Sequence, residues 1–185
     1  KYTGYLNFSG SGGWDEFTDE GSYILVKDSA GSLFPDFSTT PTGESTIDPK
    51  GSSFTIDFHV LIPDIANANQ VICQMVPDGV QNRGFVLALT GNHTTTSSGI
   101  IFSVVSGAAR FTAQAAIDKG SWQRVVASYD RTIDANNLKL YINESLKSTS
   151  YAYDIEDFYF NASTFSIGTG SIIATGSTDP LASDT

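Results

Sequence analysis

Apolar and polar residues alternate most clearly in the stretch from Phe54 to Ile62. The apolar members of this stretch are Phe54, Ile56, Phe58, Val60 and Ile62. A period of two is that of a β-strand with one buried face and one solvated face, and the proline that follows the stretch cannot donate to a ladder. The pattern therefore predicts a strand that ends at Pro63.

Two further regular runs, Trp122–Tyr129 and Leu138–Ile142, are joined by the polar connector DRTIDANN. The first run is rich in β-branched and aromatic residues, and the second places apolar residues on alternate positions. Asp and Asn bond their own backbone and tolerate left-handed conformations, so the connector is typical of a turn. The stretch predicts a β-hairpin.

Shorter apolar segments recur along the chain, separated by Gly, Asn, Asp or Ser. They are YLNFS near Tyr5, SYILVK near Tyr23, VICQMV near Val71, GFVLALT near Phe85, GIIFSVV near Ile101, RFTAQAA near Phe111 and TFSIG near Phe165. No window of helical length keeps an apolar stripe at positions i, i+3 and i+4 between capping residues. The spacing favours an all-β, antiparallel two-sheet sandwich.

The 185 residues fit one domain with one core. We expect this domain to cover residues 1–170, with a tail or linker at 171–185 where the strand pattern fades. Residues 28–51 hold three prolines and are interpreted as a long surface loop, and loops of this length are usually functional or disordered.

The net charge of the chain limits the classes of partner that it can bind. The net charge is −10 and only 16% of residues are charged, so phosphate backbones would be repelled and nucleic acid is not an expected partner. No stretch approaches the ~20 apolar residues that cross a bilayer, so we expect no membrane insertion, and the N-terminus lacks the features of a signal peptide. The single cysteine, Cys73, lies in an apolar strand and is interpreted as a small buried side chain.

The order of these segments resembles the laminin-G-like, or concanavalin A-like, jelly-roll family. The motifs that carry the resemblance are SFTIDFHVLIPD, GSWQRVVASYD, NNLKLYINESL and FSIGTG. In that family a W-x-x-V-x-x-x-Y-D strand leads into a turn and an L-x-L-Y-x-N/D-G strand follows, with Glu144 here in place of the usual Gly. The resemblance implies a jelly roll whose central strands form the hairpin, with Trp122 and Tyr129 packed in its core.

One family feature is missing. The family closes with a strand of the form G-x-I-D-E-V-R-I-Y beside its first strand, and nothing after Gly170 matches it. Because an unpaired edge invites pairing with another chain, we expect either a longer protein or a neighbouring chain that completes the edge.

Catalytic patterns are weak. Relatives that hydrolyse glycans place two carboxylates about 5 Å apart on one strand, and the acidic cluster WDEFTDEG has neither the spacing nor the strand. His59 is interpreted as an ordinary strand residue and His93 as a solvated loop residue. With one Cys and two His there is no transition-metal motif. We expect no enzyme activity.

Calcium is the candidate cofactor, because it takes oxygen ligands from carboxylates, amides and carbonyls. One candidate set is Asp15, Glu16, Asp19 and Glu20. A second set is Asp130, Asp134, Asn136 and Asn137. The alternative is that the acids keep the chain soluble and that Asp and Asn simply make turns, and the sequence leaves both open.

Sugar recognition needs a planar aromatic side chain near amides and carboxylates. Trp14 lies in a Gly-rich loop beside Asp15, and Tyr151 and Tyr153 lie in the acidic stretch YAYDIEDFYF. These three residues are the candidate ligand-binding set, although the two tyrosines also fit an alternating strand or an edge cover. Asn-x-Ser/Thr glycosylation motifs occur at Asn7, Asn92, Asn143 and Asn161.

Two classes of function remain. The first is a non-catalytic recognition or adhesion module that binds glycan or a surface protein through loops of the sandwich, on an extracellular, cell-surface or virion-surface protein. The second is a structural or decorative module of a larger assembly such as a virion, filament or adhesin. A fold alone does not decide between them.

Overall fold

The computed structural model describes residues 24–26, 52–64, 70–77, 83–90, 96–106, 109–153, 155 and 163–168. Those segments contain ten strands and no helix. The strands are β1 (Ile24–Val26), β2 (Phe54–Leu61), β3 (Gln70–Pro77), β4 (Arg83–Thr90), β5 (Ser97–Ser106), β6 (Ala109–Asp118), β7 (Trp122–Tyr129), β8 (Leu138–Ile142), β9 (Ser145–Ser150) and β10 (Ser163–Ile167).

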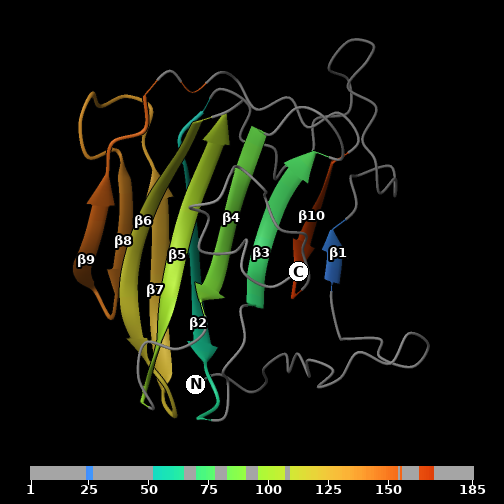
Figure 1. Cartoon of the computed structure of the whole chain (residues 1–185), viewed down its shortest axis with the longest axis vertical. Helices are drawn as coiled ribbons and strands as arrows, with labels where there is room; N and C mark the ends of the chain where they lie inside the picture. Colours follow the sequence, from blue (N-terminus) through green and yellow to red (C-terminus); the bar gives the residue numbers. More distant parts are fainter. Residues whose placement is uncertain are drawn as a thin grey trace.

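The strands form two antiparallel sheets that lie face to face (Figure 1). One sheet has six strands in the order β1-β10-β3-β4-β5-β6, and the other has four in the order β2-β7-β8-β9. The predicted hairpin is confirmed as β7 paired with β8, with Tyr129 opposite Leu138 and Val125 opposite Ile142. The all-β sandwich expected from the alternation is therefore the fold.

The core lies between the two sheets. In β2 the predicted alternation is borne out, because its odd-numbered residues are exposed while its apolar, even-numbered residues pack inward. Phe54 contacts Phe85 of the opposite sheet with ring centroids 4.8 Å apart, and it meets the fully buried Phe102 edge-on at 6.0 Å. Cys73 also faces this core, and burial raises the pKa of its thiol to about 12. The interpretation of Cys73 as a buried side chain is confirmed.

The two sheets differ on their outer faces. In the four-stranded sheet, side chains alternate between buried and at least partly exposed along β7 and β8, and between partly buried and exposed along β2. In the six-stranded sheet, β4 and β5 are buried on both faces, and Val86, Ala88, Ile101 and Val105 form a second apolar cluster on the side away from the main core. Among the described residues, the outer face of the six-stranded sheet is therefore buried over β4 and β5 but exposed along β6 at Gln114, Ala116 and Asp118.

A two-residue turn closes the β8–β9 hairpin at one end of the four-stranded sheet. Asn143 and Glu144 have φ angles of 49° and 66°, the left-handed pair that a tight hairpin of type I′ requires. The Asn143 side chain fixes this conformation, because its Oδ1 accepts from the Arg124 backbone N–H at 3.0 Å and its Nδ2 donates to Gln123. This support explains how Glu144 takes the place of the Gly usual in this turn.

One expectation about the core is wrong. Trp122 is 52% exposed and does not pack between the sheets, whereas Tyr129 is buried as expected. The two residues lie an odd number of positions apart on one regular strand, so their side chains point to opposite faces. Trp122 lies on the outer face, paired across the sheet with Leu61, which is 41% exposed.

Candidate functional site

The site is built on the turn that joins β7 to β8, residues 130–137. Oδ1 of Asp130 accepts hydrogen bonds from the backbone N–H and the hydroxyl of Thr132, at 2.9 and 2.6 Å, and from the hydroxyl of Ser53 at 3.2 Å. The bonds from Thr132 are the main reason that the pKa of Asp130 is below its ordinary value. At the other end of the turn, the backbone N–H of Asp130 donates to the carbonyl of Asn137 at 2.9 Å. The turn is therefore a fixed structure, as the Asp- and Asn-rich sequence predicts.

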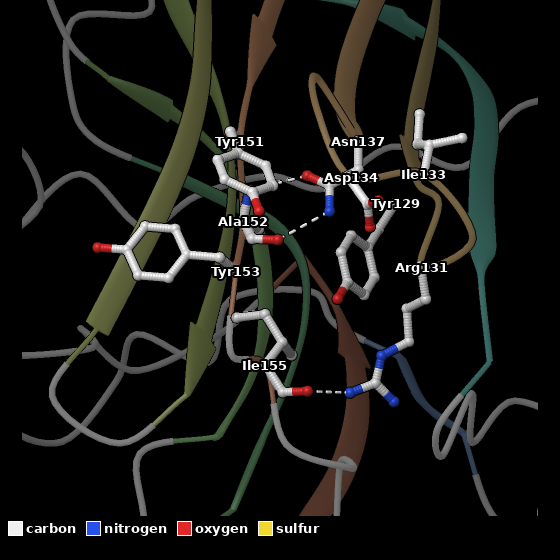
Figure 2. A pocket seen from close by; sticks show the side chains of 9 residues that line it. All are labelled: Tyr129, Arg131, Ile133, Asp134, Asn137, Tyr151, Ala152, Tyr153 and Ile155. Atoms are coloured by element: carbon white, nitrogen blue, oxygen red, sulfur yellow. Dashed lines mark hydrogen bonds between the residues drawn. The ribbon is translucent and has the colours of Figure 1, made fainter.

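Asn137 connects this turn to the segment that follows β9. Its side chain is 3% exposed and makes two hydrogen bonds to the backbone of Ala152. Nδ2 donates to the Ala152 carbonyl at 2.7 Å, and Oδ1 accepts from the Ala152 N–H at 2.8 Å. Figure 2 shows both bonds as dashed lines between the turn and the segment. A buried amide satisfied on both sides holds its neighbours in one geometry.

The segment held by Asn137 carries Tyr151 and Tyr153 on either side of Ala152. The two residues are 47% and 54% exposed, and their ring centroids lie 5.5 Å apart with a 40° angle between the planes. Tyr153 also meets Phe111 of β6 at 4.9 Å in an edge-on contact. The pair is thus supported by the end of the six-stranded sheet and by Asn137, while about half of each side chain remains open to solvent.

A hollow of about 290 Å³ lies beside the tyrosines. It is lined by Tyr129, Arg131, Ile133, Asp134, Asn137, Tyr151, Ala152, Tyr153 and Ile155 (Figure 2). Arg131 crosses it to donate to the Ile155 carbonyl, which ties the chain beyond Tyr153 to the turn. Burial raises the pKa of the Tyr129 hydroxyl, and the neighbouring Arg131 guanidinium opposes that rise. Arg131 and the exposed Asp134 give the hollow one positive and one negative side chain.

A family model named Laminin_G_3 and described as the concanavalin A-like lectin/glucanases superfamily matches residues 17–182. The chain belongs to this superfamily. The assignment agrees with the two antiparallel sheets and confirms the resemblance read from the strand motifs. No curated protein matches the chain at a significant level.

Membership of the concanavalin A-like superfamily suggests a carbohydrate- or protein-binding module. The superfamily includes glycosidases, although laminin G-like domains are generally non-catalytic and are commonly extracellular. In the part of the chain that the structure describes, no helix is long and apolar enough to cross a membrane.

Two of the three ligand-binding residues expected in this concanavalin A-like chain, Tyr151 and Tyr153, are brought together at the hollow. They do not form a strand, so the alternative of an alternating strand is wrong for this pair. Trp14 lies outside the described residues, as do the acidic cluster Asp15, Glu16, Asp19 and Glu20 and the glycosylation motifs at Asn7, Asn92 and Asn161. The motif at Asn143 lies in the exposed β8–β9 turn, with its amide engaged as described above.

Three residues of the second candidate calcium set make hydrogen bonds to different partners. Asp130 binds Thr132 and Ser53, and Asn137 binds Ala152. Asn136 has φ 52° and accepts a hydrogen bond from the Thr149 hydroxyl at 3.3 Å. Among the described residues there is no group of three or more His, Cys, Asp or Glu side chains placed to hold a metal ion. These residues build the turn, which is the alternative that the sequence left open.

Arg131 was not expected as a site residue, and Asn137 was expected only as a candidate calcium ligand. Each acts through a backbone group between 15 and 24 positions away in the sequence. The sequence identifies Asn137 in part, because a polar side chain directly before the buried run Leu138–Ile142 is expected to need a hydrogen-bond partner. No local pattern identifies Arg131.

Proposed function

We propose that this chain is a non-catalytic recognition module that binds a neutral glycan in the Tyr151–Tyr153 hollow. The observation that carries the proposal is the half-exposed tyrosine pair, held by the buried Asn137 beside a polar recess. Large aromatic side chains are costly to leave in water, and rings with a polar tip are favoured where a ligand is partly apolar and partly wet. A sugar ring, with C–H faces and hydroxyl edges, has this character.

The size and charge of the hollow support a small neutral ligand. Its volume of about 290 Å³ lies just below the range of small-molecule ligand sites, which span about 300–1,000 Å³. Arg131 and Asp134 offer opposite charges, so a ligand with a net charge gains from one and loses to the other. Hydroxyl groups, which both donate and accept, suit both side chains. We therefore propose that the hollow holds the terminal sugar of a glycan on an extracellular surface.

The test is a glycan array with neutral and acidic glycans, followed by calorimetric titration of the best-bound soluble glycan. We expect Tyr151→Ala and Tyr153→Ala each to weaken binding about tenfold, since an aromatic contact is worth roughly 1–1.5 kcal/mol. Trp122→Ala is the matched control, because Trp122 is equally exposed but lies at the opposite end of β7, and its titration should match that of the unchanged chain.

Two results would overturn the proposal. One is an array without binding, and the other is glycan binding that survives both tyrosine variants unchanged. A titration repeated with a calcium chelator examines the remaining metal candidate, Asp15, Glu16, Asp19 and Glu20. If chelation abolished binding and the two tyrosine variants bound as the unchanged chain does, the ligand site would be assigned to that cluster instead.

A further inference from the structure

The outer face of the four-stranded sheet carries large apolar side chains where a solvated sheet ordinarily has polar ones. Of the exposed large apolar side chains in the described segments, three lie on this face: Leu61, Trp122 and Leu146, at 41%, 52% and 49% exposure. Leu61 and Trp122 are direct cross-strand partners at one end of the face. Farther along, Val126, Tyr141 and Leu146 form a second row across β7, β8 and β9.

Arg124 lies between the two apolar rows, and its ion-pair partner Asp57 lies in line with the second row, directly opposite Val126. Arg124 donates from Nε to Asp57 Oδ1 at 3.1 Å and from a terminal nitrogen to Asp57 Oδ2 at 2.6 Å, and Glu144 lies 3.8 Å from the same guanidinium. Together, the four strands and the turn at 143–144 hold three basic residues, Arg124, Lys139 and Lys147, and two acidic residues, Asp57 and Glu144. The charge of this sheet is therefore +1, against −10 for the whole chain.

Two features of this face argue for a protein surface as its occupant. Trp, Tyr and Arg are the residue types that dominate binding energy at protein interfaces, and one of each is present here as Trp122, Tyr141 and Arg124. Leu61, Trp122 and Leu146 also leave large apolar side chains in water, and their removal from water favours association.

We propose that the outer face of the four-stranded sheet is the contact surface of a symmetric dimer of this chain. Charge selects the partner, because a second copy is repelled by the strongly acidic remainder of the molecule but not by this nearly neutral sheet. Charge also favours two-fold symmetry, since a surface with adjacent positive and negative groups is self-complementary when Arg124 of each copy approaches Asp57 of the other.

The dimer would leave the tyrosine hollow open. Trp122 begins β7 and Tyr129 ends it, so Trp122 and the end of β7 at the hollow are separated by up to ~23 Å of extended strand. Trp122 points outward, whereas Tyr129 points toward the core beneath the hollow. Self-association and glycan binding are thus independent properties, and either one can fail without the other.

The test is sedimentation equilibrium of the purified chain over a concentration series, compared with Trp122→Ala and Leu61→Ser. We expect a monomer–dimer equilibrium that each substitution weakens at least about 30-fold, as for the residues that carry most of the binding energy of an interface. Tyr153→Ala, which alters an aromatic side chain of similar exposure at the hollow, should leave the dimer constant unchanged. Circular dichroism verifies that each variant is folded.

Charge reversal makes the test specific to a two-fold contact. Arg124→Asp alone places two negative groups at the centre and should abolish the dimer, whereas Arg124→Asp combined with Asp57→Arg restores complementarity and should recover it. A chain that stays monomeric at all concentrations overturns the proposal, as does a dimer indifferent to Trp122 and Arg124. An open series of larger oligomers overturns the two-fold arrangement. Glycan binding lost on Trp122→Ala would assign the face to a sugar instead.

Discussion

The two sheets of this sandwich use the same alternation of side chains for different purposes. In the six-stranded sheet, β4 and β5 are buried on both faces, so every side chain from Phe85 to Leu89 and from Ile100 to Val105 is removed from water. In the four-stranded sheet, β7 and β8 bury every second residue and β2 buries every second residue in part, and the others lie on a face that solvent reaches. The six-stranded sheet thus mainly supports the fold, whereas the four-stranded sheet has side chains that a partner can reach.

The distribution of exposed apolar side chains follows this division. Within the described residues, all five large apolar side chains with high exposure belong to the four-stranded sheet or to the segment that leaves it after β9. They are Leu61, Trp122, Leu146, Tyr151 and Tyr153. The exposed side chains of the four-stranded sheet and of the segment after β9 can therefore be substituted without disturbing the main core, so this side of the molecule is suited to recognition.

The largest effect expected from this comparison concerns one substitution made on each outer face. Val86→Ala in β4 removes fully buried methyl groups and should lower the free energy of unfolding by about 2–3 kcal/mol. Val126→Ala on the outer face of β7 is the matched control and should cost less than about 1 kcal/mol, because that side chain is partly solvated already. Urea denaturation at low protein concentration measures both. Equal losses would show that the outer faces do not differ.

A smaller effect is expected where the four-stranded sheet holds the tyrosine segment. Asn137→Ala leaves the buried N–H and carbonyl of Ala152 without partners, which should cost about 2 kcal/mol of unfolding free energy and weaken glycan binding although both tyrosines remain. Asn136→Gly is the control, since it removes a neighbouring amide but keeps the left-handed backbone that φ 52° requires. Calorimetric titration with thermal unfolding measures both properties. Unchanged glycan affinity in Asn137→Ala would show that the segment is held by other contacts.

Much of the fold is readable from the sequence, because the period of two is a local signal. The alternation from Phe54 and the hairpin at 122–142 identify β2, β7 and β8, the inward face of β2 and the pairing of β7 with β8. The pairing of β2 with β7 was not predicted. The error at Trp122 came from giving residue type more weight than parity. Positions 122 and 129 differ by seven, so a regular strand cannot place both in the core. The alternation of odd and even positions predicts that Trp122 is exposed if Tyr129 is buried, whereas residue type alone predicts a buried tryptophan.

The candidate site was only partly predictable, for a physical reason. Composition identifies Tyr151 and Tyr153 as aromatic residues in a polar setting. The contact that makes them a site is tertiary, since Asn137 and Ala152 lie 15 positions apart and Phe111 belongs to the other sheet. The Asp and Asn residues of the 130–137 turn fit a cation site or a turn equally well in composition. Only the hydrogen bonds of Asp130 and Asn137 show where their oxygens are used.

The smallest effect concerns the ion pair on the outer face of the four-stranded sheet. The hydrogen bond from Arg124 is the main reason that the pKa of Asp57 lies below its ordinary value of 3.8. A carboxyl whose pKa is lowered by folding stabilises the folded state above its unfolded pKa, and this contribution is lost as the pH falls through the folded value. Both side chains are substantially exposed, at 40% and 44%, so solvent weakens the pair.

We therefore expect monomeric Asp57→Asn to melt slightly below the unchanged chain at pH 6, with the difference vanishing well below pH 3.8. Thermal unfolding from pH 2 to 7 measures this difference and cancels the titration of the other carboxyls, Asp130 included. A difference that stays constant across that range would mean that Asp57 acts through packing or neutral hydrogen bonds, and that the charges on this face contribute nothing to the fold.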